Sequence, residues 1–391
     1  MIRTWAIGLL LLVPLALAAN AALAQQPASP KAVFQTAQQA LAEHDYRRAE
    51  SGFREYLKMD PRSVAALSNL SVAYLRLGNY EAAIATLQKA KTLAPDVPQL
   101  DLNLGLAYYQ NQEFAKAIPE FSNFLKASPG SHQAQYLLGV SYFMQEQWPQ
   151  ALAALEPLQE TESANPDYLF ELGVAYGKCN RPQDSVRTFE RMIQAGGETA
   201  QMHLLLGVAY LSLEQNSKAR IELEKAVSQS PRLMFAHYNL GVACQRLGQA
   251  AQAVSEFKQE MTIAPHQPWS YESLGAIYLQ QSNQNEALQM FNKALSINPR
   301  LPNSLGGIGK IYLQNGQPAK AISYLQKAVD LQPGSAKMHF QLGQAYLKVG
   351  DKLKAEKELA EAGRLQAEAR NAFQNDMSGE LPAPRYSGEG H

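Results

Sequence analysis

The stretch LLLGVAYLSL, residues 204–213, contains the pentapeptide LGVAY, and near copies of this pentapeptide recur along the chain. The copies are LSVAY at 70–74, LGLAY at 104–108, LGVSY at 138–142, LGVAY at 172–176 and LGVAC at 240–244. Each copy begins 34 residues after the one before it. A fixed period of this length indicates an array of structural repeats.

Two further positions recur in the same frame. A second small residue stands twelve residues after the glycine, and a large apolar residue follows four residues later, as in Gly105, Ala117 and Phe121. Most repeats also end in a proline, such as Pro129 or Pro265. The frame divides the chain between residues 30 and 369 into ten repeats of 34 residues, with no insertion between them.

Each repeat has the pattern of two helices joined by a short turn. In its first half, apolar residues fall at repeat positions 4, 7, 8 and 11, which form one stripe on an α-helix. In its second half, the small and the large apolar residue lie four apart and therefore share a face. The proline ends the second helix. Residues suited to cap the next helix follow at Ser63, Ser131, Asn165, Thr199 and Ser335.

This pattern resembles the tetratricopeptide repeat (TPR) family, of the exported bacterial type. The resemblance implies an all-α fold, a right-handed α-solenoid of about ten TPR helix-turn-helix units with a C-terminal capping helix. A proline-free, charged segment from Asp351 to about Asn375 suits that cap. Ser163 and Gly197 replace the terminal proline of repeats 4 and 5, and Ser185 replaces an alanine. These departures predict a local change of curvature.

The two ends of the chain differ from the repeats. Residues 1–24 have the pattern of a secretory signal peptide, because one Arg precedes an apolar segment that ends in Ala22-Leu23-Ala24. We expect cleavage after Ala24 and a periplasmic or extracellular protein, with an uncleaved N-terminal membrane anchor as the alternative. Residues 25–29 form a linker. Residues 370–391 hold the end of the capping helix and a tail expected to be disordered.

Composition and motifs argue against several classes of function. The chain has 35 basic and 35 acidic residues, a balance that does not favour a nucleic-acid partner. The sequence contains no haem-attachment, zinc-protease or phosphate-loop motif, so we expect no enzyme, no cofactor and no metal.

Two smaller sets of residues invite a chemical interpretation. His203, His237 and His339 share repeat position 4, where packing is favoured over a metal ladder because neighbouring repeats are too far apart to share an ion. Cys179 and Cys244 lie two repeats apart, beyond the reach of a disulfide.

The first helix of each repeat has a second side, formed by repeat positions 2, 5, 9 and 12. The family resemblance implies that this side lines the concave groove in which partners bind; we call it the inner wall. Apolar residues fill it in repeats 2 to 7, and a contiguous apolar patch usually marks a binding surface. The predicted groove residues are Tyr136, Val140, Phe143, Phe170, Val174, Leu204, Val208, Leu211, Tyr238 and Val242.

The valines at repeat position 9 also have a structural interpretation, in which they pack against the first helix of the next repeat. Taken together, the sequence predicts a non-enzymatic protein–protein interaction scaffold that binds an apolar peptide or helix of a partner. One alternative is a component of an envelope export or assembly machine, such as polysaccharide secretion, in a membrane-associated complex. Another is a regulatory partner of an enzyme in trans.

Overall fold

The computed structural model describes residues 29–196 and 198–378 of the 391-residue chain. The predicted signal peptide at 1–24, nearly all of the linker and the tail from residue 379 lie outside the described residues. Within the described ranges every regular element is helical, as predicted. None of these helices is both long and apolar enough to cross a membrane.

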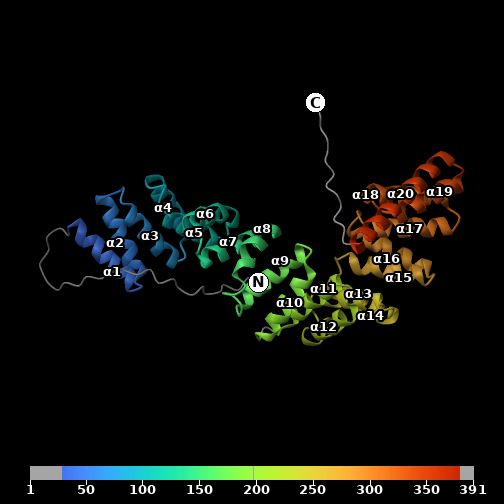
Figure 1. Ribbon diagram of the computed structural model, residues 1–391, viewed down its shortest axis with the longest axis horizontal. Coiled ribbons are helices and arrows are strands. Elements are labelled where there is room, and N and C mark those ends of the chain that lie inside the picture. Colours follow the sequence, from blue (N-terminus) through green and yellow to red (C-terminus); the bar gives the residue numbers. More distant parts are fainter. Residues whose placement is uncertain (1–28, 197, 379–391) are drawn as a thin grey trace, which may run out of the picture. The chain divides into compact units, whose positions relative to one another are not determined.

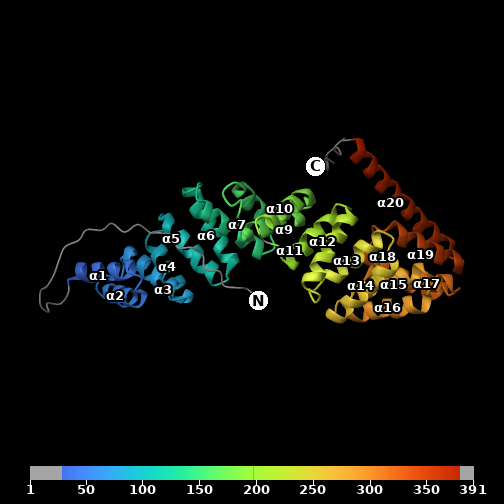
Figure 2. The same ribbon diagram turned by 90° about the horizontal axis from the view of Figure 1, so that it is seen from below.

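Consecutive helices form pairs that correspond to the predicted repeats (Figures 1 and 2). The first five pairs are formed by α1 (Pro30–Ala42) and α2 (Tyr46–Met59), α3 (Val64–Arg76) and α4 (Tyr80–Leu93), α5 (Pro98–Gln110) and α6 (Phe114–Ala127), α7 (His132–Met144) and α8 (Trp148–Leu155), and α9 (Pro166–Lys178) and α10 (Pro182–Gln194). The next five are formed by α11 (Ala200–Ser212) and α12 (Asn216–Gln229), α13 (Ala236–Arg246) and α14 (Ala250–Ile263), α15 (Trp269–Gln280) and α16 (Gln284–Ile297), α17 (Pro302–Gln314) and α18 (Pro318–Leu331), and α19 (Ala336–Val349) and α20 (Lys352–Ser378).

The helical pairs belong to two compact units, which are divided in the sequence between Thr188 and Phe189, within α10. We call them the N-terminal unit and the C-terminal unit. The division falls in the fifth repeat, where the sequence departs from the repeat pattern. The change of curvature predicted there stays a prediction.

Most of the predicted N-caps are confirmed. The side chains of Ser63, Ser131, Asn165 and Thr199 each accept a hydrogen bond from a backbone N–H in the first turn of the helix that follows. They thereby satisfy donors that a helix leaves free at its start. Ser335 is the N-cap residue of α19, but its side chain makes no such bond.

The repeated glycine brings the two helices of a pair close together. A Cβ atom on Gly105 would lie 2.7 Å from Cε1 of Phe121, and one on Gly207 would lie 2.5 Å from Cγ of Leu223. Both separations are shorter than real Cβ contacts. In repeats 3, 4 and 6 to 10, the glycine and the large apolar residue that recur in the sequence are therefore the two sides of one contact.

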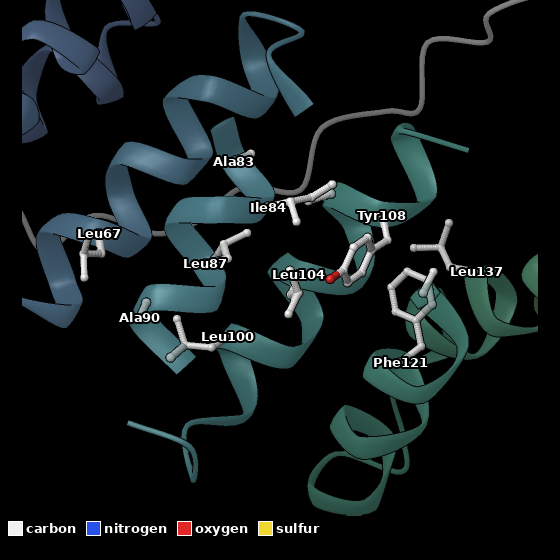
Figure 3. Close-up of a cluster of buried hydrophobic side chains, with 12 residues drawn as sticks. Leu67, Ala83, Ile84, Leu87, Ala90, Leu100, Leu104, Tyr108, Phe121 and Leu137 are labelled. Carbon is white, nitrogen blue, oxygen red and sulfur yellow. The ribbon is translucent and has the colours of Figure 1, made fainter. Parts of the chain in front are cut away.

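Neighbouring repeats share their cores. In the N-terminal unit, Leu67 of α3, Leu87 of α4, Leu104 of α5, Phe121 of α6 and Leu137 of α7 belong to one buried cluster (Figure 3). The cluster thus contains residues of three successive repeats. A single repeat does not enclose a core of this kind, which is the property expected of a solenoid.

The fourth repeat is irregular for a reason that the sequence analysis did not use. Helix α8 has only 8 residues and passes into a 3-10 helix at Glu156–Leu158. Pro157 lies at this transition, and proline has no N–H with which to continue an α-helical ladder. The hydroxyl of the buried Tyr168 donates to the carbonyl oxygen of Leu155 at 2.9 Å, which ties the end of α8 to α9.

The fifth repeat accommodates its serine. Ser185 is buried in place of the usual alanine, and its hydroxyl donates to the carbonyl oxygen of Gly173 at 2.7 Å. The buried hydroxyl is therefore satisfied. At the C-terminal end of the array, α20 continues beyond residue 369, where the tenth repeat ends, and the predicted C-terminal helix is thereby confirmed.

Candidate partner-binding site

Five of the predicted groove residues lie in the N-terminal unit, on the first helices of repeats 4 and 5. Helix α7 carries Tyr136, Val140 and Phe143, and α9 carries Phe170 and Val174. The rings of Phe143 and Phe170 are 6.2 Å apart. Four of the five side chains are partly exposed, whereas Val140 is buried. The structure thus brings these residues onto two adjacent helices as a partly open aromatic surface.

The other five lie in the C-terminal unit, on α11 and α13. Leu204 and Leu211 are buried, Val208 is exposed, and Tyr238 and Val242 are partly buried. The ring of Tyr238 packs against Phe257, with centroids 5.7 Å apart. More of this surface is occupied by packing than in the N-terminal unit.

The valines at repeat position 9 do not share one environment. Val140 is 5% exposed and Val208 is 37% exposed, although both occupy the same repeat position. Val140 fits the packing interpretation, and Val208 is open to a partner. The part that these valines play in binding stays a prediction.

A carboxyl group with one buried oxygen atom lies on the same surface, and it was not predicted from the sequence. Glu171 of α9 occupies repeat position 6, and its Oε2 atom is buried without a hydrogen-bond partner among the described residues. Burial raises the pKa of Glu171 to about 8, against the opposing effect of the Tyr136 hydroxyl, which favours the ionised form by hydrogen bonding. The nearby charge of Asp167 raises the pKa of Glu171 further.

Two phenol groups share this environment. Burial, followed by the charges of Glu171 and Asp167, raises the pKa of Tyr109 on α5 to about 12. Burial and Glu171 also raise the pKa of Tyr136 far above its usual value. Tyr109 on α5, Tyr136 on α7 and Glu171 on α9 therefore influence one another across three successive first helices.

The contact between Tyr136 and Glu171 is one example of a recurring arrangement. A side chain at repeat position 6 meets the side chain at position 5 of the preceding repeat: Asn103 donates to the Ser68 hydroxyl at 3.5 Å, and Ser273 bonds to Tyr238. The sequence contains a signal for Glu171, because this residue occupies the repeat position at which other repeats have Asn69, Asn103 and Asn239.

The histidines at repeat position 4 pair with glutamates of their own repeat rather than with one another. In each case Nδ1 meets a carboxylate oxygen nineteen residues further along the chain. The pairs, with their distances, are His203–Glu222 at 2.6 Å, His237–Glu256 at 2.6 Å and His339–Glu358 at 2.7 Å. These pairs join the two helices of a repeat. Cys179 and Cys244 are both free.

The inner wall of the last repeats has a different character. A pocket of about 330 Å³ opens between α15, α17 and α19 in the C-terminal unit, and its lining includes Gly306, Gly307, Lys310 and Lys337. Glu272, which also lines it, accepts hydrogen bonds from the backbone N–H and the hydroxyl of Ser304 at 3.1 and 2.6 Å. The carboxylate thus caps the start of α17.

Stacked helical pairs that share their cores define an α-solenoid repeat protein. The family models agree: a tetratricopeptide repeat model matches residues 34–98, 102–168 and 170–233, and a second one matches residues 232–300. A model for anaphase-promoting complex, cyclosome, subunit 3 matches residues 280–362. The chain belongs to the tetratricopeptide repeat family.

Several solved structures are similar to this chain. A chain of the APC/C hetero-tetramer Cut9–Hcn1 is 14% identical, with a TM-score of 0.47, over 87% of this chain and 87% of that one. Yeast Tom70 is 15% identical, with a TM-score of 0.42, over 86% and 92%. YrrB, described as a TPR protein with an unusual peptide-binding site, is 22% identical, with a TM-score of 0.39, over 47% and 95%. No curated protein matches the chain.

Proposed function

We propose that this chain is a non-enzymatic scaffold that binds an apolar peptide or helix of a partner protein on the inner wall of its first helices. The family fold suggests a protein–protein interaction scaffold. The proposal that an apolar peptide or helix binds on the inner wall is supported by the partly exposed aromatic surface of α7 and α9. Its members are Tyr136, Phe143, Phe170 and Val174.

Contacts within the protein hold this surface in place. Phe143 packs edge-on against Trp148 at 5.3 Å and lies beside Phe170 at 6.2 Å, and Tyr136 lies beside the buried Tyr168 at 6.2 Å. Rings that are already held lose little freedom when a ligand arrives. Aromatic side chains in such positions also supply much of the binding energy at protein interfaces.

The test compares matched lysine substitutions. Val174→Lys places a charge on the surface of α7 and α9, whereas Ile221→Lys places one at an exposed apolar residue on the second helix of repeat 6. We expect Val174→Lys to lose partners that the wild type and Ile221→Lys both capture from an envelope extract, with unchanged helical content. Val208→Lys tests the corresponding position in the C-terminal unit. If all variants retain the same partners, the inner wall is not the binding surface.

We further propose that the protein acts outside the cytoplasm, on the basis of the signal-peptide pattern in residues 1–24. N-terminal sequencing of the protein from an envelope fraction tests this, since a mature start at Gln25 is expected. An intact N-terminus in the membrane would favour the anchored alternative. Recovery in one stable complex with membrane proteins would favour the export or assembly machine, and recovery with a soluble enzyme would favour the regulatory role.

A further inference from the structure

We propose that the inner wall at α5, α7 and α9 binds a lysine or arginine side chain of the partner segment, with Glu171 as its counter-ion. This inference rests on the proposed function, because it names the chemistry of the segment that the aromatic surface takes. It concerns residues of the N-terminal unit alone.

Side chains of adjacent first helices meet at repeat positions 5 and 6. Where position 6 of one repeat meets position 5 of the preceding repeat, the pairs Ser68–Asn103 and Tyr238–Ser273 consist of neutral groups that hydrogen-bond to each other. At α7 and α9 a carboxyl group takes the position-6 place, and Tyr136 alone does not satisfy it. The buried Oε2 atom of Glu171 has no hydrogen-bond partner among the described residues. A buried acceptor without a donor is uncommon in a native fold, and a donor brought by a ligand would complete it.

In the described part of the chain, the titratable groups around Glu171 include no positively charged side chain. The titratable groups that face Glu171 are Tyr109 from α5, Tyr136 from α7 and Asp167 from its own helix. None of these is a cation. Lys178, on the same helix, lies over the ring of Trp148 instead, with Nζ 5.5 Å from the ring centroid. Once Glu171 is ionised, the site therefore has the charge complementary to a basic side chain and would repel an acidic one.

Aromatic rings lie on the same inner wall as the Glu171 carboxyl. The Tyr109 ring is held by Phe114 and Phe121 at 5.4 and 6.4 Å, and Phe143 and Phe170 continue the surface along α7 and α9. Aromatic faces attract ammonium and guanidinium groups and also accept aliphatic stems. A basic residue flanked by apolar residues is thus the segment that this surface fits.

The affinity for a basic segment is expected to depend on pH. With a pKa of about 8, Glu171 carries its proton at neutral pH in the free protein. A bound cation favours the ionised form, so binding releases a proton. Affinity for a basic segment is therefore expected to rise with pH up to about 8 and to level off above it.

The experiment uses the full mature chain and short leucine-rich peptides that differ in one central residue, which is Lys, Arg, Gln or Glu. Fluorescence anisotropy measures each Kd at several pH values. We expect the wild type to bind the Lys and Arg peptides at least about tenfold more tightly than the Gln peptide at a pH above 8. Glu171→Gln is expected to bind the Lys and Gln peptides equally, while its affinity for the Gln peptide is retained.

Glu160→Gln is the matched control, since it removes an exposed carboxylate from the same repeat region and is expected to keep the preference for Lys. A preference for Lys that survives in Glu171→Gln, or equal binding of all peptides to the wild type, would overturn the cation site and leave the apolar surface standing. Failure of every peptide to bind would overturn the proposed function as well.

Discussion

The inner walls at α7–α9 and at α15–α19 carry different kinds of side chain at the same repeat positions. Position 5 holds Tyr136 and Phe170 in the first region, whereas in the second it holds Glu272, Gly306 and a single aromatic residue, Phe340. The first is an aromatic surface that also carries the partly buried carboxyl of Glu171, and the second is a pocket of about 330 Å³ with two lysines in its lining. Both regions contain the contact between a glycine of the first helix and a large apolar residue of the second, as in Gly139–Leu155 and Gly275–Phe291.

The difference shows that two sets of positions vary independently. The packing positions build the solenoid and hardly change along the chain. The inner-wall positions change from repeat to repeat without disturbing the frame. Membership of the family therefore follows from the first set, and any statement about a partner has to come from the second.

The strongest test of this separation targets the packing glycine. Gly105→Ala is expected to destabilise the protein by about 2 to 3 kcal/mol, because the new Cβ would overlap the buried Phe121 ring. Gly363→Ala is the matched control: it is also a helical glycine, but a Cβ there meets nothing within 4 Å. It should instead stabilise by about 0.5 to 1 kcal/mol through helix propensity. Urea denaturation measures both, and equal effects would contradict the proposed role of the glycine.

The next test removes one ring from each inner wall. Phe170→Ala is expected to weaken binding of the Lys-containing peptide by about 2 kcal/mol, or roughly thirtyfold in Kd, since it opens the aromatic surface. Phe340→Ala removes the same residue at the same repeat position in the tenth repeat, where the ring is 49% exposed, and should leave binding unchanged. Equal losses in the two variants would show that the regions do not differ in the way described.

A third test uses the dependence of stability on pH. Because the pKa of Glu171 is raised to about 8 in the folded protein, the folded state holds a proton that the unfolded state has already released. The protein therefore loses stability as the pH rises from the usual carboxyl pKa of 4.5 to about 8. Above about pH 8, Glu171 contributes little further change in stability. Glu171→Gln should remove about 1 to 2 kcal/mol of this loss, after allowance for partial exposure. Parallel pH profiles for the two proteins would show that the carboxyl is not buried in this way.

The smallest effect is expected at the irregular fifth repeat. Ser185→Ala restores the usual residue but removes the hydrogen bond to the Gly173 carbonyl, so we expect a loss of at most about 1 kcal/mol. Thermal unfolding measures it. A loss of several kcal/mol would mean that Ser185 does more than replace an alanine.

The sequence predicted the parts of the structure that depend on the repeat period. The helix pairs, the position of Gly105 against Phe121 and most of the N-caps follow from periodicity and local residue chemistry. The early end of α8 had a sequence signal in Pro157, which the repeat frame obscured. The burial of Val140 and the exposure of Val208 had no such signal, because the two valines occupy the same repeat position.

The site was harder to predict than the fold. Glu171 looks like one more polar residue of a first helix until its neighbours Tyr136 and Tyr109, from two other repeats, are placed around it. The pairs of His203, His237 and His339 with glutamates likewise join the two helices of a repeat. A side chain that acts through another helix is visible only once the spacing of those helices is known.

The shared core of Leu67, Leu87, Leu104, Phe121 and Leu137 bears on how the chain acquires its structure. All of its residues come from three successive helical pairs, so no distant part of the sequence has to be found first. Such short contact separations favour rapid assembly. A chain that emerges gradually from its N-terminus can therefore complete each layer as the following one appears, and each new layer closes the apolar face that the previous one left open.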